Sequence, residues 1–227
     1  MKKILLAVAA VSVILGFILF DSCSKVSTSP PIITLLGPNP YNVTLNSAYT
    51  DPGETAVDNE GNSLTSSIFN NITSKNPNMN LAGTYTIWYT VYDVSGFKFT
   101  INRTVNVVNS AAYLAGNYSV SDTRTGNDNV SLTYITTISQ SFTQNNVIYI
   151  NNFGNFGAPV QVSALVNGNA LIIAPQSPSG INPAPVINGL QGSGSVNSTS
   201  IVGINYSVDW GGSPDAAVSD FAVYTKM

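Results

Sequence analysis

Residues 84–107 read TYTIWYTVYDVSGFKFTINRTVNV, and the fold of the N-terminal half follows from them. In the first part, Tyr85, Ile87, Tyr89 and Val91 alternate with threonines and two aromatic residues, and the second part alternates in the same way. A period of two residues is that of a β-strand with one buried face. A Ser-Gly pair at residues 95–96 separates the two parts and indicates a turn. The stretch therefore predicts a β-hairpin, which needs further strands to bury its apolar face.

Shorter apolar runs supply those strands at residues 32–36, 41–45 and 63–69. Turn-forming residues separate the runs, and no segment has the 3.6-residue period of an amphipathic helix. The number and spacing of the runs predict a β-sandwich over residues 32–109.

The same region resembles the bacterial surface Ig-like domain that is common in Bacteroidetes lipoproteins. The resemblance implies a spacer or adhesion module without catalytic activity. It is carried by Tyr49-Thr50-Asp51-Pro52-Gly53, Ala56, Asp58, Gly83-Thr84-Tyr85-Thr86, Tyr89, Asp93, Gly96 and Arg103-Thr104-Val105.

Arg103 falls on the apolar face of its predicted strand, so we expect a buried ion pair. A buried guanidinium needs a carboxylate partner to offset the cost of removing it from water. Asp51, Asp58 and Asp93 are the candidates, and Asp58 and Asp93 are preferred. The acidic residues between positions 51 and 60 also suggest a calcium loop, but their spacing matches no such loop, so turn formation is favoured and no metal site is predicted.

The C-terminal half, residues 113–227, also has the pattern of short strands. A two-residue Asn-Gly signal at positions 167–168 predicts a tight hairpin. Eight strands with mostly short loops predict an up-and-down β-barrel or a sandwich of similar size. The expected strands are residues 117–122, 130–141, 147–151, 160–166, 170–174, 192–196, 201–210 and 221–226.

This half is similar to the C-terminal lipocalin-like domains of Bacteroidetes lipoproteins. The resemblance is carried by Gly116-Asn117-Tyr118-Ser119-Val120, by residues 150–157 and by Gly192-Ser193-Gly194. A tandem Asn-Phe-Gly at residues 152–157 either presents two aromatic rings to a ligand or plugs one end of the barrel, and the plug is favoured. The candidate ligand-binding residues are Phe153, Phe156 and Trp210.

The N-terminus predicts export and lipid attachment. Two lysines precede an uncharged run at residues 4–20, and Cys23 is the only cysteine of the chain. This arrangement is typical of a secretory signal over residues 1–22. Ser22-Cys23 resembles the lipobox of bacterial lipoproteins, which implies lipidation of Cys23. The Ser, Thr and Pro residues that follow predict a tether over residues 23–31. A retained membrane anchor and a cleaved signal with an incidental cysteine are the alternatives.

Composition narrows the range of functions. Only 8% of the 227 residues are charged, the net charge is −3 and histidine is absent. An acidic chain is a poor partner for nucleic acid, and the commonest general base and metal ligand is missing. We therefore expect neither a cofactor nor an enzymatic activity.

The sequence as a whole predicts an all-β protein, in which an Ig-like β-sandwich precedes a lipocalin-like antiparallel β-barrel or second sandwich. The first functional hypothesis is a lipid-anchored cell-envelope protein whose barrel binds a glycan or small amphiphile. The alternative is an adhesion protein that contacts other envelope proteins. A hydrolase using two carboxylates among Asp209, Asp215 and Asp220 is the third. The expected location is the outer membrane, with the side of the membrane left open.

Overall fold

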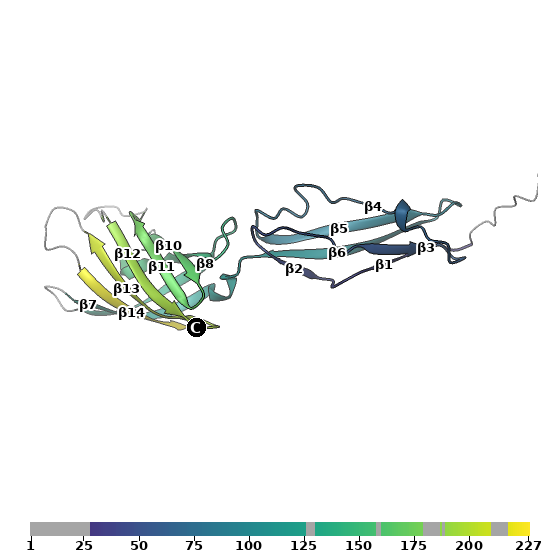
Figure 1. The fold of residues 1–227 in the computed structure, drawn as a ribbon. Coiled ribbons are helices and arrows are strands. Elements are labelled where there is room, and N and C mark those ends of the chain that lie inside the picture. Colours follow the sequence, from purple (N-terminus) through teal and green to yellow (C-terminus); the bar gives the residue numbers. More distant parts are fainter. Residues whose placement is uncertain (1–27, 126–129, 158–159, 179–186, 188, 210–217) are drawn as a thin grey trace, which may run out of the picture. The chain divides into compact units, whose positions relative to one another are not determined.

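The computed structural model describes residues 28–125, 130–157, 160–178, 187, 189–209 and 218–227 (Figure 1). The predicted signal peptide, Cys23 and most of the tether lie outside these residues. The described chain is all-β, and its helical elements are three short 3-10 turns: η1 (Thr65–Ser67), η2 (Ala112–Leu114) and η3 (Phe153–Asn155). No helix among the described residues has the length and apolarity needed to cross a membrane.

The N-terminal half forms two sheets, as expected for an Ig-like sandwich. In the first, β1 (Ile32–Leu35) pairs antiparallel with β3 (Glu54–Val57). The second has the order β2-β6-β5-β4, in which β2 runs parallel to β6. Its strands are β2 (Tyr41–Thr44), β4 (Phe69–Asn70), β5 (Gly83–Tyr92) and β6 (Lys98–Val108).

Strands β5 and β6 are the predicted hairpin, and their alternation is confirmed. On β5, Ile87, Tyr89 and Val91 are buried, whereas Trp88 and Tyr92 are exposed. The turn between the strands is closed by the Asp93 carboxylate, which accepts hydrogen bonds from the backbone N–H groups of residues 95 and 97.

Two strand predictions in this half were wrong. Residues 63–69 were expected to be one strand, but they form η1 followed by the two-residue strand β4. Strand β3 was missed because only Ala56 of its four residues is buried, which leaves no visible alternation. Its conformation is fixed by pairing with β1 and by Thr65, whose Oγ1 accepts a hydrogen bond from the Ala56 backbone at 3.1 Å.

Packing divides the chain into two compact units. One holds the described residues up to Leu36 with Pro52–Asn70 and Trp88–Ile101, and the other holds Gly37–Asp51, Asn71–Ile87 and the described residues from Asn102 onward. This division cuts across β5 and β6, so the domain boundaries derived from the sequence stay predictions.

The chain between the two halves is hydrogen-bonded to the barrel through Asn109. Asn109 is buried, and its side-chain amide donates to the carbonyl groups of Ser141, Gln144 and Val147 at 2.8, 3.1 and 3.0 Å. Its Oδ1 accepts from the backbone N–H of Ala111. The Asn109 side chain therefore holds the chain just before β7 to the loop between β8 and β9.

The C-terminal half is a closed eight-stranded antiparallel barrel (Figure 1). The order is β10-β11-β12-β13-β14-β7-β8-β9, and pairing of β7 with β14 closes it. All eight strands expected from the sequence are present. They are β7 (Gly116–Thr125), β8 (Ser131–Gln140), β9 (Val147–Asn151), β10 (Gln161–Asn167), β11 (Ala170–Gln176), β12 (Gly189–Val196), β13 (Ile201–Asp209) and β14 (Val218–Lys226).

Side chains pack the interior of the barrel. An eight-stranded barrel is just wide enough for its side chains to fill it. The inward residues include bulky aliphatic and tyrosine side chains from every strand, and Leu132 packs against them half-buried. The buried members of the interior include Tyr118, Val120, Tyr134, Ile204, Tyr206 and Val208.

Candidate functional site

Glycines shape the outer wall of the barrel where β12 and β13 meet. Gly192 of β12 pairs with Tyr206 of β13, and a Cβ atom at position 192 would lie 2.6 Å from the Asn205 carbonyl oxygen. At Gly194 the corresponding distance, to the Gly203 carbonyl oxygen, is 2.3 Å. Real Cβ atoms do not approach so closely, so this close approach of the two strands requires glycine.

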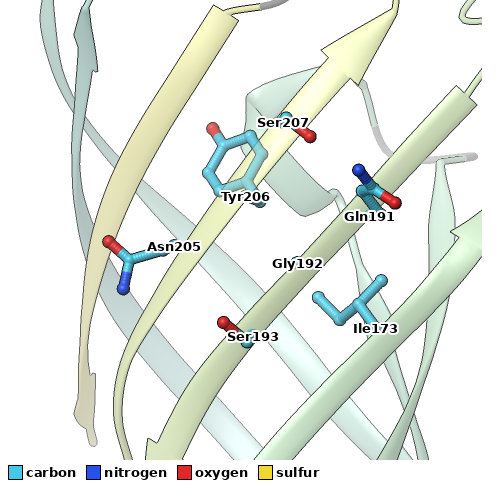
Figure 2. Close-up of a pocket in the computed structure, with 7 residues that line it drawn as sticks. All are labelled: Ile173, Gln191, Gly192, Ser193, Asn205, Tyr206 and Ser207. Carbon is cyan, nitrogen blue, oxygen red and sulfur yellow. The ribbon is translucent and has the colours of Figure 1, made fainter.

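The wall over Gly192 is hollowed, and the hollow has a volume of about 330 Å³. Figure 2 shows the side chains around it, which come from β11, β12 and β13. Four of them are neutral and polar: Gln191 and Ser193 on β12, and Asn205 and Ser207 on β13. None of these four side chains makes a hydrogen bond to another described residue. Their amide and hydroxyl groups are therefore available to a ligand.

A second hollow, of about 260 Å³, adjoins the first and shares Ser193 and Asn205 with it. Phe221 of β14 lies at its side, directly opposite Asn205 in the strand register. The Phe221 ring covers Gly203 and is 46% exposed. We call the two hollows together the wall groove. Its lining contains no charged side chain.

A second polar group of residues lies inside the barrel. Asp122 on β7 and Asp220 on β14 are buried, and the Nε atom of Arg124 lies 3.8 Å from a carboxylate oxygen of Asp122 and 4.0 Å from one of Asp220. Tyr206 donates a hydrogen bond of 2.6 Å to Asp122 Oδ2. Tyr134 and Tyr224 are also buried beside them. We call these six residues the interior cluster.

Burial raises the pKa of both carboxyl groups in the interior cluster. For Asp122, the Tyr206 hydrogen bond and the charge of Arg124 lower its pKa in part. For Asp220, the charge of Asp122 adds to the effect of burial and raises its pKa further. Burial likewise raises the pKa of the Tyr134, Tyr206 and Tyr224 hydroxyls above their usual range, so they stay protonated.

The tandem Asn-Phe-Gly segment covers this cluster. Phe153 is fully buried, and its ring packs edge-on against Tyr206 with centroids 4.8 Å apart. Phe156 is half-buried, and the Arg124 guanidinium lies 4.8 Å from its ring centroid. Arg124 also donates a hydrogen bond to the Gly154 carbonyl. Phe153 is therefore the plug that the sequence favoured, and its assignment as a ligand-binding residue is corrected because no face of its ring is exposed.

Of the other residues singled out from the sequence, the structure describes Asp209 and Asp220, which differ in burial. Asp209 is exposed on β13, whereas Asp220 is buried inside the barrel next to Asp122. Trp210 and Asp215 lie outside the described residues. The carboxylate that lies beside Asp220 is therefore Asp122, which the alternation of β7 places inside and which the hydrolase hypothesis did not include.

In the Ig-like domain, Arg103 is fully buried, as its position in the alternation predicted. Its Nε lies 3.5 Å from Asp51 Oδ1, and its Nη1 donates to the Pro38 carbonyl at 2.8 Å. This corrects the preferred partners. Asp58 accepts hydrogen bonds from Glu60 and Asn62 within its own loop, and Asp93 closes the hairpin turn. Within the described ranges, no three acidic or cysteine side chains gather where they could hold a metal ion.

One group of exposed residues was missed. Phe69 on β4 and Trp88 and Tyr92 on β5 are between 37% and 47% exposed, and Phe69 contacts both of the others. Phe69 stacks on Tyr92 with centroids 6.0 Å apart and meets Trp88 edge-on at 5.9 Å. The alternation marked Trp88 and Tyr92 as outward, but Phe69 was expected only as the end of a strand at residues 63–69, with no partner assigned to it. We call the three residues the aromatic patch.

Residues 33–107 match the family model described as bacterial surface protein, Ig-like domain. No curated protein matches the chain. Among solved structures, the lipoprotein BT2262 from Bacteroides thetaiotaomicron is 20% identical, with a TM-score of 0.38, covering 86% of this chain and 100% of the other. A structure of CBM51-2 in complex with GlcNAc and INT domains, from Clostridium perfringens ZmpB, is 14% identical. Its TM-score is 0.27, and the match covers 86% of this chain and 44% of the other. A structure of the M60 catalytic domain with the CBM51-1 and CBM51-2 domains of the same protein is 16% identical. Its TM-score is 0.28, and the match covers 87% of this chain and 24% of the other.

Proposed function

We propose that this protein is a lipid-anchored, non-catalytic binding protein of the bacterial cell envelope, and that its barrel binds an uncharged saccharide in the wall groove. The Ig-like domain is the spacer of this arrangement. Its match to a bacterial surface domain supports a location at the cell envelope. The Ser22-Cys23 pair after an uncharged run supports attachment through lipid on Cys23.

The observation that carries the proposal is the chemistry of the wall groove. Sugar hydroxyl groups both donate and accept hydrogen bonds, and the amides of Gln191 and Asn205 and the hydroxyls of Ser193 and Ser207 do the same. The apolar face of a sugar ring packs against an aromatic side chain, and Phe221 offers one beside Asn205. The groove has no charged side chain among its described residues, so nothing in it favours an anionic or a cationic ligand.

The open shape of the groove also bears on the ligand. Deep clefts bury most of the surface of a small ligand. The wall groove is instead a pair of adjoining shallow hollows along β12 and β13. Such a surface suits a short run of linked sugar units, which contacts the wall along its length, better than an isolated small molecule.

A panel of immobilised neutral glycans tests the proposal. The wild-type protein should bind at least one member, and Asn205→Ala or Phe221→Ala should weaken that binding roughly tenfold, about 1.4 kcal/mol. Ile135→Ala is the matched control, because Ile135 is also exposed on the barrel, at 62%, but lies on β8, away from the groove. Unchanged binding in both groove variants, with loss in the control, would refute the site.

The aromatic patch favours a second candidate function, adhesion to another envelope protein. Exposed aromatic side chains that touch one another are enriched at protein interfaces. If adhesion is the function, Trp88→Ala should abolish attachment to partner cells while Asn205→Ala leaves it intact. The reverse result would favour the saccharide.

A further inference from the structure

The interior cluster holds polar groups that the wall groove does not use and that ordinary packing does not explain. Two carboxylate oxygens and two tyrosine hydroxyls are buried and make no hydrogen bond of ordinary geometry to the described protein atoms, although the two hydroxyls lie near each other. Buried polar groups are normally paired, because an unpaired one keeps the full cost of leaving water. The unpaired atoms are Asp122 Oδ1, Asp220 Oδ1, Tyr134 Oη and Tyr224 Oη.

Charge balance in the cluster depends on a single proton. Among the residues that the structure describes, the titratable or charged groups that face it are Asp122 and Arg124 on β7, Tyr134 on β8, Tyr206 on β13, and Asp220 and Tyr224 on β14. The tyrosines are neutral. With one proton on the aspartate pair, the remaining carboxylate balances Arg124. With both carboxylates ionised, one negative charge in the barrel interior is left without a partner, which is costly.

Arg124 connects this charge balance to the segment that covers the cluster. Its guanidinium donates to the Gly154 carbonyl and lies over the Phe156 ring. Its Nε is buried without a hydrogen-bond partner and lies 3.8 and 4.0 Å from the two carboxylates, too far for a hydrogen bond to either. A stronger negative charge on the aspartate pair would therefore draw Arg124 inward, away from Gly154 and Phe156.

The covering segment, residues 152–157, is anchored at its start by the buried Phe153 ring and by the Asn152 side chain, which donates to the Ile135 carbonyl, whereas the rest of it has an irregular backbone. Asn152, Gly154 and Asn155 have φ values of 47°, 60° and 54°, in the left-handed region that is costly for residues other than glycine. Two backbone hydrogen bonds of 3.2 Å, from Asn155 and Phe156, close the η3 turn. Loss of the contacts to Arg124 would loosen Gly154 and Phe156, while the buried Phe153 ring still anchors the start of the segment.

We propose that a proton held by the Asp122–Asp220 pair latches residues 152–157 over this end of the barrel, and that release of the proton to solvent frees the segment. The closed state is therefore populated at low pH and the open state at high pH. The direction of this pH dependence follows from burial. A carboxyl group that is costly to ionise when buried binds its proton more tightly in the folded, closed protein, so protonation favours the closed state. The latch acts at the end of the barrel and does not depend on a saccharide in the wall groove.

Hydrogen exchange measured by mass spectrometry on the full-length protein in detergent micelles tests the latch. The readout is the protection of residues 152–157, taken as the intrinsic rate divided by the measured rate, which removes the direct effect of pH on exchange. In the wild type, protection should fall at least tenfold as the pH rises from 4 to 9. The turn at residues 197–200, between β12 and β13, is the internal control and should not change.

Three variants complete the test. Asp220→Asn leaves one ionisable carboxyl opposite Arg124, so protection should stay high and independent of pH, and Asp122→Asn should do the same if the first variant does not fold. Asp209→Asn is the matched control, because this exposed aspartate of β13 lies outside the cluster. A wild-type segment with equal protection across the pH range would overturn the proposal, and so would a pH dependence that persists in Asp220→Asn.

Discussion

At the scale of single residues, alternation in the sequence predicted burial but not partners. Arg103 was expected to be buried because it falls on the apolar side of its strand, and it is. Its partner Asp51 lies 52 positions away in the sequence. Three acidic residues satisfied the same argument, and only the folded backbone, which also brings the Pro38 carbonyl to Arg103, selects among them.

The two phenylalanines of the covering segment also differ in a way that the sequence does not show. Both follow an asparagine and precede a glycine, yet Phe153 is fully buried and Phe156 only half-buried. The left-handed residues at 152, 154 and 155 turn the chain so that the two rings take different directions. Repetition in sequence therefore did not give repetition in structure.

Phe153→Ala should lower the free energy of unfolding by about 3–5 kcal/mol, because it removes a fully buried ring from the barrel core. Phe156→Ala should cost less, since its ring is half-buried and its main loss is the contact with Arg124. Urea denaturation of both variants measures the difference. Wild-type stability in Phe153→Ala would show that this ring is not part of the core.

At the scale of elements, long alternating strands were predictable and short ones were not. The ten-residue strand β5 shows its alternation clearly, whereas β3 has four residues and a single buried side chain. The conformation of so short a segment is decided by pairing with another strand, and that pairing cannot be read from the sequence of the segment itself. The predicted hairpin at residues 167–168 is present, but its two loop residues are 168–169, one position later.

Strand β12 offers a direct test of how its glycines shape the wall groove. Gly192→Ala should destabilise the protein by about 1–3 kcal/mol, because the new methyl group would meet the β13 backbone and force the strands apart. Ser193→Ala is the matched control on the same strand, since Ser193 is exposed and makes no side-chain hydrogen bond to a described residue. Equal thermal stability of the two variants would contradict the close-packed arrangement.

At the scale of the whole molecule, the sequence predicted a barrel for the C-terminal half and kept a second sandwich as the alternative. Closure depends on the pairing of β7 with β14, whose residues are about a hundred positions apart, and no local pattern reports such a contact. The wall groove was not predictable for the same reason. Its glycines and polar residues are visible in the sequence, but only the register of β12 against β13 brings Ser193 beside Asn205.

The proposed attachment to the membrane also concerns the whole molecule. Cys23→Ala should move the protein from the membrane fraction to the soluble fraction and abolish labelling by radioactive palmitate, because the acyl chains that anchor it are lost. Fractionation of cells expressing either form measures this. Palmitate incorporation by the variant would rule out Cys23 as the site of lipidation.

The central claim is that a neutral saccharide binds to the outer wall of the barrel. Amide chemical-shift mapping of the isotope-labelled protein, titrated with the best glycan from the panel, tests it most directly. We predict that the perturbed amides cluster on β12 and β13 around Ser193 and Asn205 and extend to Phe221 on β14. Perturbations confined to residues 152–157, or to the aromatic patch at Phe69, Trp88 and Tyr92, would place the ligand elsewhere and contradict the account.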